Sequence, residues 1–176
     1  GAKRALNNYP RLTQYLVNSM KASGDTVRLK RLGYAIGGEA TTAGVSSKAE
    51  VAANYVGAPF GTSSGFLPAS CSAVGPSLLV KGEFNRPYIM MTAAEVLLRL
   101  AQAKERYGAG VNLAGTAQEY FEEGLKQSYR AFGANSAAAT SYVGSGVDNY
   151  DYVASTNKLS AIAIQKLVAL CNFNGL

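Results

Sequence analysis

A short acidic and aromatic segment carries the residues of this sequence best suited to chemistry. It runs Asp148-Asn149-Tyr150-Asp151-Tyr152. Two carboxylates three positions apart in a loop could approach each other as an acid–base pair, or bind calcium together with the asparagine. Nothing in the pattern indicates the raised carboxyl pKa that hydrolysis needs, and the full EF-hand spacing is missing. We therefore expect neither catalysis nor a metal site in this segment.

The composition excludes several catalytic classes. The sequence has no histidine, and its two cysteines, Cys71 and Cys171, form no Cys-x-x-Cys pair. The usual zinc sites, cysteine–histidine nucleophiles and serine–histidine–aspartate triads are therefore ruled out. The adjacent Glu122 and Glu123 point in different directions on a helix, so they cannot form a glycosidase pair. We expect no enzyme and no cofactor. The cysteines are open to two interpretations, a disulfide or two buried thiols, and thiols are the simpler one.

Positive charge is concentrated near the amino-terminal end. The net charge is +6, and residues 1–31 hold seven of the 17 basic residues against one acid, Asp25. Such an end can bind phosphate or an anionic surface, and Arg28, Lys30 and Arg31 would be its centre. No recognisable nucleic-acid motif accompanies it. A solvated face is the simpler interpretation, and polyanion binding is the alternative.

The first half of the sequence predicts few regular elements. An amphipathic pattern predicts a helix over Tyr9–Met20, with Tyr15 and Leu16 on its apolar side. Residues Val27–Ile36 mix basic and apolar side chains and are expected to be extended. Residues 37–80 are dominated by Gly, Ala, Ser and Thr, which predicts long irregular connections.

The second half predicts three helices. Thr92-Ala93-Ala94-Glu95 is a capping box that should begin a helix ending at Tyr107. Thr116-Ala117-Gln118-Glu119 repeats the box and should begin a second helix ending near Phe132. Small residues on the first helix and aromatic residues on the second favour close packing, as in antiparallel helix pairs of the tetratricopeptide kind. A third helix is expected to begin at Ser155 or Thr156 and to continue through Leu170.

Three segments in order resemble the SusD/RagB family. Pro87–Ala103 resembles the family pattern "AEv-x-L-x-x-AEA", Ala117–Leu125 resembles "a-x-x-y-Y-e-x-G-I", and Ile162–Leu170 resembles "I-x-x-QK-y-i-A-L". More weakly, Asp25–Leu32 and Tyr55–Gly61 are similar to the "D-P-R-l" and "Y-x-G-x-P-x-G" stretches. One alanine-rich helix would be a weak signal, but three in the correct order make a fairly specific match.

The sequence departs from that family at several points. Gln102 stands where the AEA motif has glutamate, and Asp25 is followed by Thr-Val-Arg instead of Pro-Arg. The "E-x-W-x-x-x-R-R" continuation and the lipidated cysteine are absent from the sequence. We therefore expect 1–176 to be a single, partial SusD-like domain from a longer protein. Its parts would be a loop-rich 1–86 with an amino-terminal helix, and a helical hairpin plus a third helix over 87–176.

The resemblance implies a mainly α fold with tetratricopeptide-like helix pairs and long irregular loops. It also implies a non-catalytic lipoprotein that binds an oligosaccharide or other glycan at the cell surface and delivers it to a SusC-like TonB-dependent transporter. Nucleic acid is not an expected partner. The outer membrane would be reached only through a lipid anchor, because no apolar run approaches the roughly 20 residues that cross a bilayer. The alternative is a helical-repeat module that binds a peptide or glycoprotein.

A glycan ligand would need aromatic faces with polar groups beside them. Tryptophan is absent, but the sequence has 11 tyrosines. The candidate ligand-binding residues are Tyr55, Phe60, Phe66, Tyr150, Asp151 and Tyr152. For each of them the simpler interpretation is that the side chain packs the protein's own loops.

Overall fold

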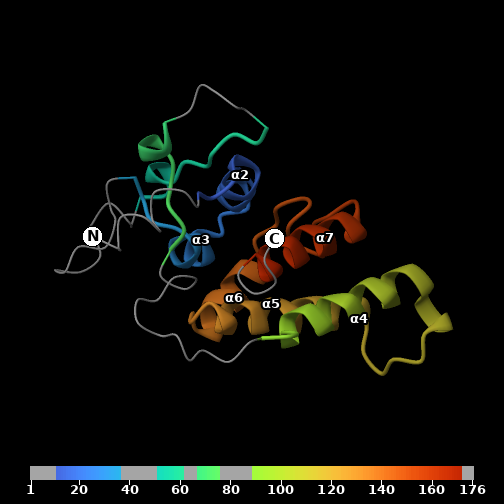
Figure 1. Cartoon of the computed structure of the whole chain (residues 1–176). Coiled ribbons are helices and arrows are strands. Elements are labelled where there is room, and N and C mark those ends of the chain that lie inside the picture. The colour runs from blue at the N-terminus through green and yellow to red at the C-terminus, as the bar shows by residue number, and fades with distance from the viewer. Residues whose placement is uncertain (1–10, 37–50, 62–66, 76–88, 172–176) are drawn as a thin grey trace. The chain divides into compact units, whose positions relative to one another are not determined.

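The computed structural model describes residues 11–36, 51–61, 67–75 and 89–171. The α-helices of these residues are α2 (Gln14–Ala22), α3 (Thr26–Leu32), α4 (Ala93–Tyr107), α5 (Ala117–Ala131), α6 (Ser136–Val143) and α7 (Lys158–Leu170). Short 3-10 turns are η2 (Ala52–Asn54), η3 (Pro68–Ser70) and η4 (Gly108–Gly110). Within these ranges β pairing is confined to isolated bridges, which confirms the predicted mainly α class. The chain forms two compact units, Gly1–Glu83 and Phe84–Leu176 (Figure 1).

In the first unit, helix α2 begins later than its sequence pattern predicts. It starts at Gln14, because Thr13 is extended and its Oγ1 accepts a hydrogen bond from the Leu16 N–H at 3.4 Å. The sequence placed Tyr15 on the apolar side of this helix, and that prediction is wrong, since Tyr15 is 60% exposed. The buried residues of α2 are Leu16, Val17, Ser19 and Met20.

The extended conformation predicted for Val27–Ile36 is also wrong over most of its length. Thr26–Leu32 is helix α3. Asp25 begins it by accepting a hydrogen bond from the Arg28 N–H at its Oδ1, 3.3 Å away. Only from Gly33, with φ −138° and ψ 166°, is the chain extended. The cap at Asp25 therefore decides the local structure of this basic segment.

Backbone contacts fix the loop that follows η2. The Gln14 N–H donates to the Ala58 carbonyl at 2.8 Å, and the Ala58 N–H donates to the Leu12 carbonyl at 2.7 Å. A Cβ at Gly57 would lie 2.3 Å from the Cα of Gln14, so no side chain fits there. Gly61 has φ +78°, a left-handed conformation that glycine adopts at little cost. Backbone packing and turn geometry thus explain both glycines of the Tyr55–Gly61 stretch.

In the second unit, α4 and α5 form the predicted hairpin (Figure 1). The Oγ1 of Thr92 accepts from the Glu95 N–H at 3.1 Å, as the first capping box predicts. The second box is complete, because Thr116 accepts from the Glu119 N–H at 3.2 Å and the Glu119 carboxylate accepts from the Thr116 N–H at 2.7 Å. Both predicted helix starts are confirmed.

Close packing of the hairpin depends on a glycine in α5. A Cβ at Gly124 would lie 2.9 Å from the Cγ of Leu98, which is fully buried in α4. The predicted pairing placed small residues on α4 against aromatic ones on α5, and here a small residue of α5 also admits a leucine of α4. The buried residues of these two helices include Ala94, Leu98, Ala101, Phe121 and Leu125.

Two further helices complete the second unit. Helix α7 was predicted from 155 or 156 and begins at Lys158, because Asn157 caps it. Helix α6 was not predicted. It begins at its cap, Asn135, and brings the Tyr142 ring to within 5.8 Å of the Tyr129 ring of α5, measured between centroids. This aromatic contact attaches α6 to the hairpin.

Candidate functional site

The aromatic candidates of the first unit differ in accessibility. Tyr55 is 1% exposed, so its ring has no free face for a ligand in this structure. Phe60 is 91% exposed and offers its ring to solvent. Phe66 lies outside the described residues. Of the two described candidates, only Phe60 can form a stacking platform, while Tyr55 packs the interior of its unit.

A second exposed ring of the first unit was not among the candidates. Tyr15 follows Gln14, whose N–H donates a hydrogen bond to the Ala58 carbonyl, and Phe60 lies two positions after Ala58. The exposed rings of Tyr15 and Phe60 therefore project from two backbone segments that are joined by a hydrogen bond. The available sequence signal was the spacing of Leu16, Val17 and Met20, because an apolar face centred on these three residues leaves Tyr15 on the opposite side of the helix.

In the second unit, the carboxylates of the 148–152 segment organise their own loop. Asp151 is buried, and its two oxygens accept hydrogen bonds from the Gly146 N–H at 2.9 Å and the Val153 N–H at 3.0 Å. Asp148 closes the loop, since its Oδ1 accepts from the Thr156 N–H at 3.0 Å. Neither carboxylate is positioned as a free acid or base. Across the described ranges, no group of three or more His, Cys, Asp or Glu residues could hold a metal ion.

Tyr152 ties that loop to the helices. Its hydroxyl donates a short hydrogen bond to the Glu105 carboxylate of α4. Its ring centroid lies 5.5 Å from that of Phe121 in α5 and 5.2 Å from the ammonium nitrogen of Lys158. Partial burial, followed by the hydrogen bond and charge of Glu105, raises the pKa of Tyr152. Tyr152 thus positions the loop, and its hydroxyl already has a partner.

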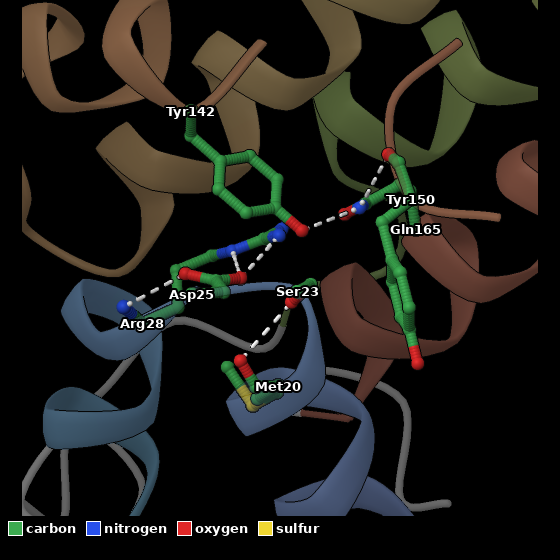
Figure 2. Close-up of polar contacts among 7 residues, drawn as sticks. All are labelled: Met20, Ser23, Asp25, Arg28, Tyr142, Tyr150 and Gln165. Atoms are coloured by element: carbon green, nitrogen blue, oxygen red, sulfur yellow. Dashed lines mark hydrogen bonds and ion pairs between the residues drawn. The ribbon is translucent and has the colours of Figure 1, made fainter. Parts of the chain in front are cut away.

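The Gln165-Lys166 pair of α7 makes contacts inside the second unit. Gln165 is 1% exposed and donates to the Tyr142 hydroxyl at 3.1 Å and to the backbone carbonyl of Tyr150 at 3.2 Å (Figure 2). Lys166 donates to the Gln102 side-chain oxygen of α4 at 2.8 Å. The ring of Tyr150 is half-buried, so it is less accessible than that of Phe60. Gln165 therefore connects α7 to α6 and to the 148–152 segment.

The basic group proposed for polyanion binding does not form one exposed patch. Arg28 is fully buried, and its guanidinium binds the Asp25 carboxylate through Nε at 2.6 Å and Nη2 at 2.5 Å (Figure 2). Lys30 is half-buried and Arg31 is exposed. Because Arg28 is buried and cannot contact a polyanion, the case for polyanion binding by this segment is weaker.

Both cysteines are free thiols, as the simpler interpretation of the sequence predicts, although that interpretation also expected both to be buried. Cys71 is buried and Cys171 is partly exposed. Burial raises the pKa of Cys171 to about 11. The thiolate is the nucleophilic form, so Cys171 is a poor nucleophile at neutral pH.

The described part of the second unit is thus a scaffold of capped helices with a hydrogen-bonded loop that carries Tyr150, Asp151 and Tyr152. A sequence model of the SusD-like family, described as "Starch-binding associating with outer membrane", matches residues 3–175. The chain belongs to this family, which confirms the resemblance found in the sequence. No curated protein and no solved structure matches the chain. None of the described helices has the length and apolar character needed to span a bilayer.

Proposed function

We propose that this protein is a non-catalytic glycan-binding protein of the outer-membrane surface that delivers oligosaccharides to a SusC-like TonB-dependent transporter. The family match over residues 3–175 carries the proposal, because that family is described as starch-binding and associated with the outer membrane. A lipid anchor on the full-length protein and the transporter partner are parts of the proposal. Binding without catalysis is consistent with Asp148 and Asp151, whose carboxylates accept backbone hydrogen bonds.

We place the principal aromatic contact of the ligand at Phe60, with Tyr15 beside it. Both rings are exposed, and the hydrogen bond between Gln14 and Ala58 holds their backbone segments together. A sugar ring presents an apolar C–H face, and such a face packs well against an aromatic ring whose polar surroundings bind the hydroxyls. Phe66 and the half-buried Tyr150 remain candidate contacts. We expect Tyr55, Asp151 and Tyr152 to support ligand binding indirectly, by holding the conformation of the loops to which they belong.

Calorimetric titration of the protein with starch oligosaccharides and a panel of other glycans tests the proposal. We expect Phe60→Ala to weaken binding by about 2- to 10-fold, the range that a stacking contact is worth. Leu67→Ala is the matched control, because Leu67 is also an exposed apolar residue of the first unit. Absence of binding to every glycan class would refute the function. Binding that is insensitive to Phe60→Ala would refute only the placement of the contact.

One surface favours the alternative of a module that binds a peptide or glycoprotein. Met90 and Met91, which precede α4, are both exposed, and so are Ile89 and Val96. Methionine side chains adapt to varied partners, and a run of exposed apolar residues is a common feature of interaction surfaces. A pull-down from outer-membrane extract separates the two functions. Recovery of proteins other than a transporter, unaffected by added glycan, would favour the alternative.

A further inference from the structure

Basic residues of two helices meet on one side of the second unit. Arg99, Gln102 and Arg106 lie three and four positions apart on α4, which places them along one face of that helix. Lys166 reaches this row from α7 and donates to the Gln102 oxygen at 2.8 Å. We call these four residues the α4–α7 basic cluster. Two elements far apart in the sequence therefore supply its side chains.

The positive charge of this cluster is only partly compensated. The guanidinium of Arg99 binds one Glu95 oxygen through Nη2 at 2.7 Å and Nε at 3.0 Å, but its side chain is still 59% exposed. Arg106 is exposed, and no carboxylate of the described residues lies within ion-pair distance of it. The partner of Lys166 is a neutral amide. One carboxylate thus accompanies three cations.

The electrostatics of Lys166 reflect this imbalance. Its pKa is lowered, first by partial burial and then by the positive charge of Arg99, with a smaller contribution from Arg106. Glu95 acts in the opposite direction and does not cancel these effects. An additional negative charge at the cluster would therefore be attracted by several cations at once.

The hydrogen-bonding groups of the cluster narrow the ligand chemistry. Arginine and lysine side chains are donors only, the Gln102 amide also carries N–H donors, and the one acceptor among the four residues, the Gln102 oxygen, already accepts from Lys166. A ligand must therefore supply acceptor oxygens, and charged oxygens would bind best. The exposed ring of Tyr107 follows Arg106 at the end of α4 and adds an apolar surface within one turn.

We propose that the α4–α7 basic cluster binds the anionic group of an acidic polysaccharide, either the carboxylate of a uronic acid or a sulfate ester. This inference rests on the proposed glycan-binding function and extends it, because starch is neutral. It assigns an anion contact to the second unit, whereas the aromatic contact at Phe60 belongs to the first. The same side chains would contribute little to the binding of a neutral glycan.

Gln102→Glu is the most informative variant. It preserves all three cations and the hydrogen-bond acceptor of Lys166, but it introduces the negative charge that the ligand would otherwise supply. We expect about a 10-fold loss of affinity for acidic glycans, unchanged affinity for starch, and a denaturation midpoint that does not fall, because Lys166 gains a charged partner. Loss of the fold therefore cannot imitate loss of binding in this variant.

Calorimetric titrations with polygalacturonate, a sulfated neutral polysaccharide and starch, each at two salt concentrations, provide the readout. Polygalacturonate binding alone identifies a carboxylate site, and binding of the sulfated glycan alone identifies a sulfate site. Arg106→Gln should lower the affinity for the acidic ligand several-fold. Arg130→Gln, at an exposed arginine of α5, is the control and should leave that affinity unchanged. The affinity for polygalacturonate or for the sulfated polysaccharide should decrease as salt increases.

Four results would overturn the inference. If starch binds and acidic glycans do not, the anion-binding role of the cluster is refuted and the proposed function is preserved. Acidic-glycan affinity that is unchanged in both Gln102→Glu and Arg106→Gln would place the anion contact elsewhere. Binding of poly-glutamate, but of no acidic glycan, would identify the cluster as a contact for a protein partner. Absence of binding to all glycans, starch included, would refute the proposed function as well.

Discussion

The side-chain amide of Gln165 donates a hydrogen bond to the hydroxyl of Tyr142, 3.1 Å away, and both residues are buried. Gln165 also donates to the carbonyl of Tyr150. These bonds connect α7 to α6 and to the loop that Asp151 organises. A glutamine in an otherwise apolar helix face is thereby explained as a structural connector, since buried polar groups need partners.

Replacing this connector should destabilise the second unit. Gln165→Leu removes both donors, and each of the two acceptors loses its hydrogen bond from the amide. We expect the free energy of unfolding to fall by about 1–3 kcal/mol, measured by urea denaturation monitored by circular dichroism. Gln118→Leu is the matched control, because that amide bonds Glu122 on the exposed surface of α5 and should cost under about 0.5 kcal/mol. Equal losses in both variants would contradict the role assigned to Gln165.

The buried ion pair between Asp25 and Arg28 should respond differently to single and double substitution. Arg28→Met leaves the Asp25 carboxylate buried without its guanidinium, and breaking such a pair costs about 3–5 kcal/mol. Asp25→Asn combined with Arg28→Met removes both charges and keeps a side chain that can cap α3. We expect the double variant to be more stable than Arg28→Met alone in the same denaturation assay. A double variant that is less stable would show that the charge of Asp25 has another essential partner.

Gly57 should tolerate no side chain. A Cβ there would lie 2.3 Å from the Gln14 Cα and 2.5 Å from its nitrogen, and backbone atoms cannot move aside as a flexible side chain can. We expect Gly57→Ala to destabilise the first unit by at least about 3 kcal/mol, the upper end of overpacking costs, and to increase its cleavage by protease. Gly110→Ala, whose Cβ would meet only Tyr107 at 3.9 Å, is the control and should behave as wild type.

The sequence predicts the fold best where local signals are strong. The capping boxes at Thr92 and Thr116 correctly located α4 and α5, because a cap and the following helix pattern depend on neighbouring residues. Helix α6 escaped detection, since Ser136–Val143 contains no charged residue and shows little contrast between its faces. Helix α3 was mistaken for an extended segment, although the acid that caps it, Asp25, was visible beside the basic run.

The candidate site is less predictable because exposure depends on distant contacts. Tyr55 and Phe60 are both aromatic residues of one Gly- and Pro-containing stretch, yet one ring is buried and the other is exposed. The difference arises from packing against segments remote in sequence, as when Ser72 Oγ accepts from the Val56 N–H. Likewise, nothing local indicates that Lys166 reaches Gln102, 64 positions away.

The capping box of α5 should make stability depend on pH. The Thr116 backbone N–H and hydroxyl donate to the Glu119 carboxylate, and these bonds lower its pKa. A carboxyl pKa that is lower in the folded state stabilises the fold above the unfolded pKa, about 4.3 for glutamate, and this contribution disappears as pH falls through the folded pKa. Glu119→Gln should therefore have a lower urea midpoint than wild type at pH 7, and the gap should narrow below about pH 4. Thr116→Ser retains both donors, so it should keep the pH dependence of wild type. Parallel midpoint curves for wild type and Glu119→Gln from pH 7 to pH 3 would show that the ionised carboxylate does not stabilise the helix start.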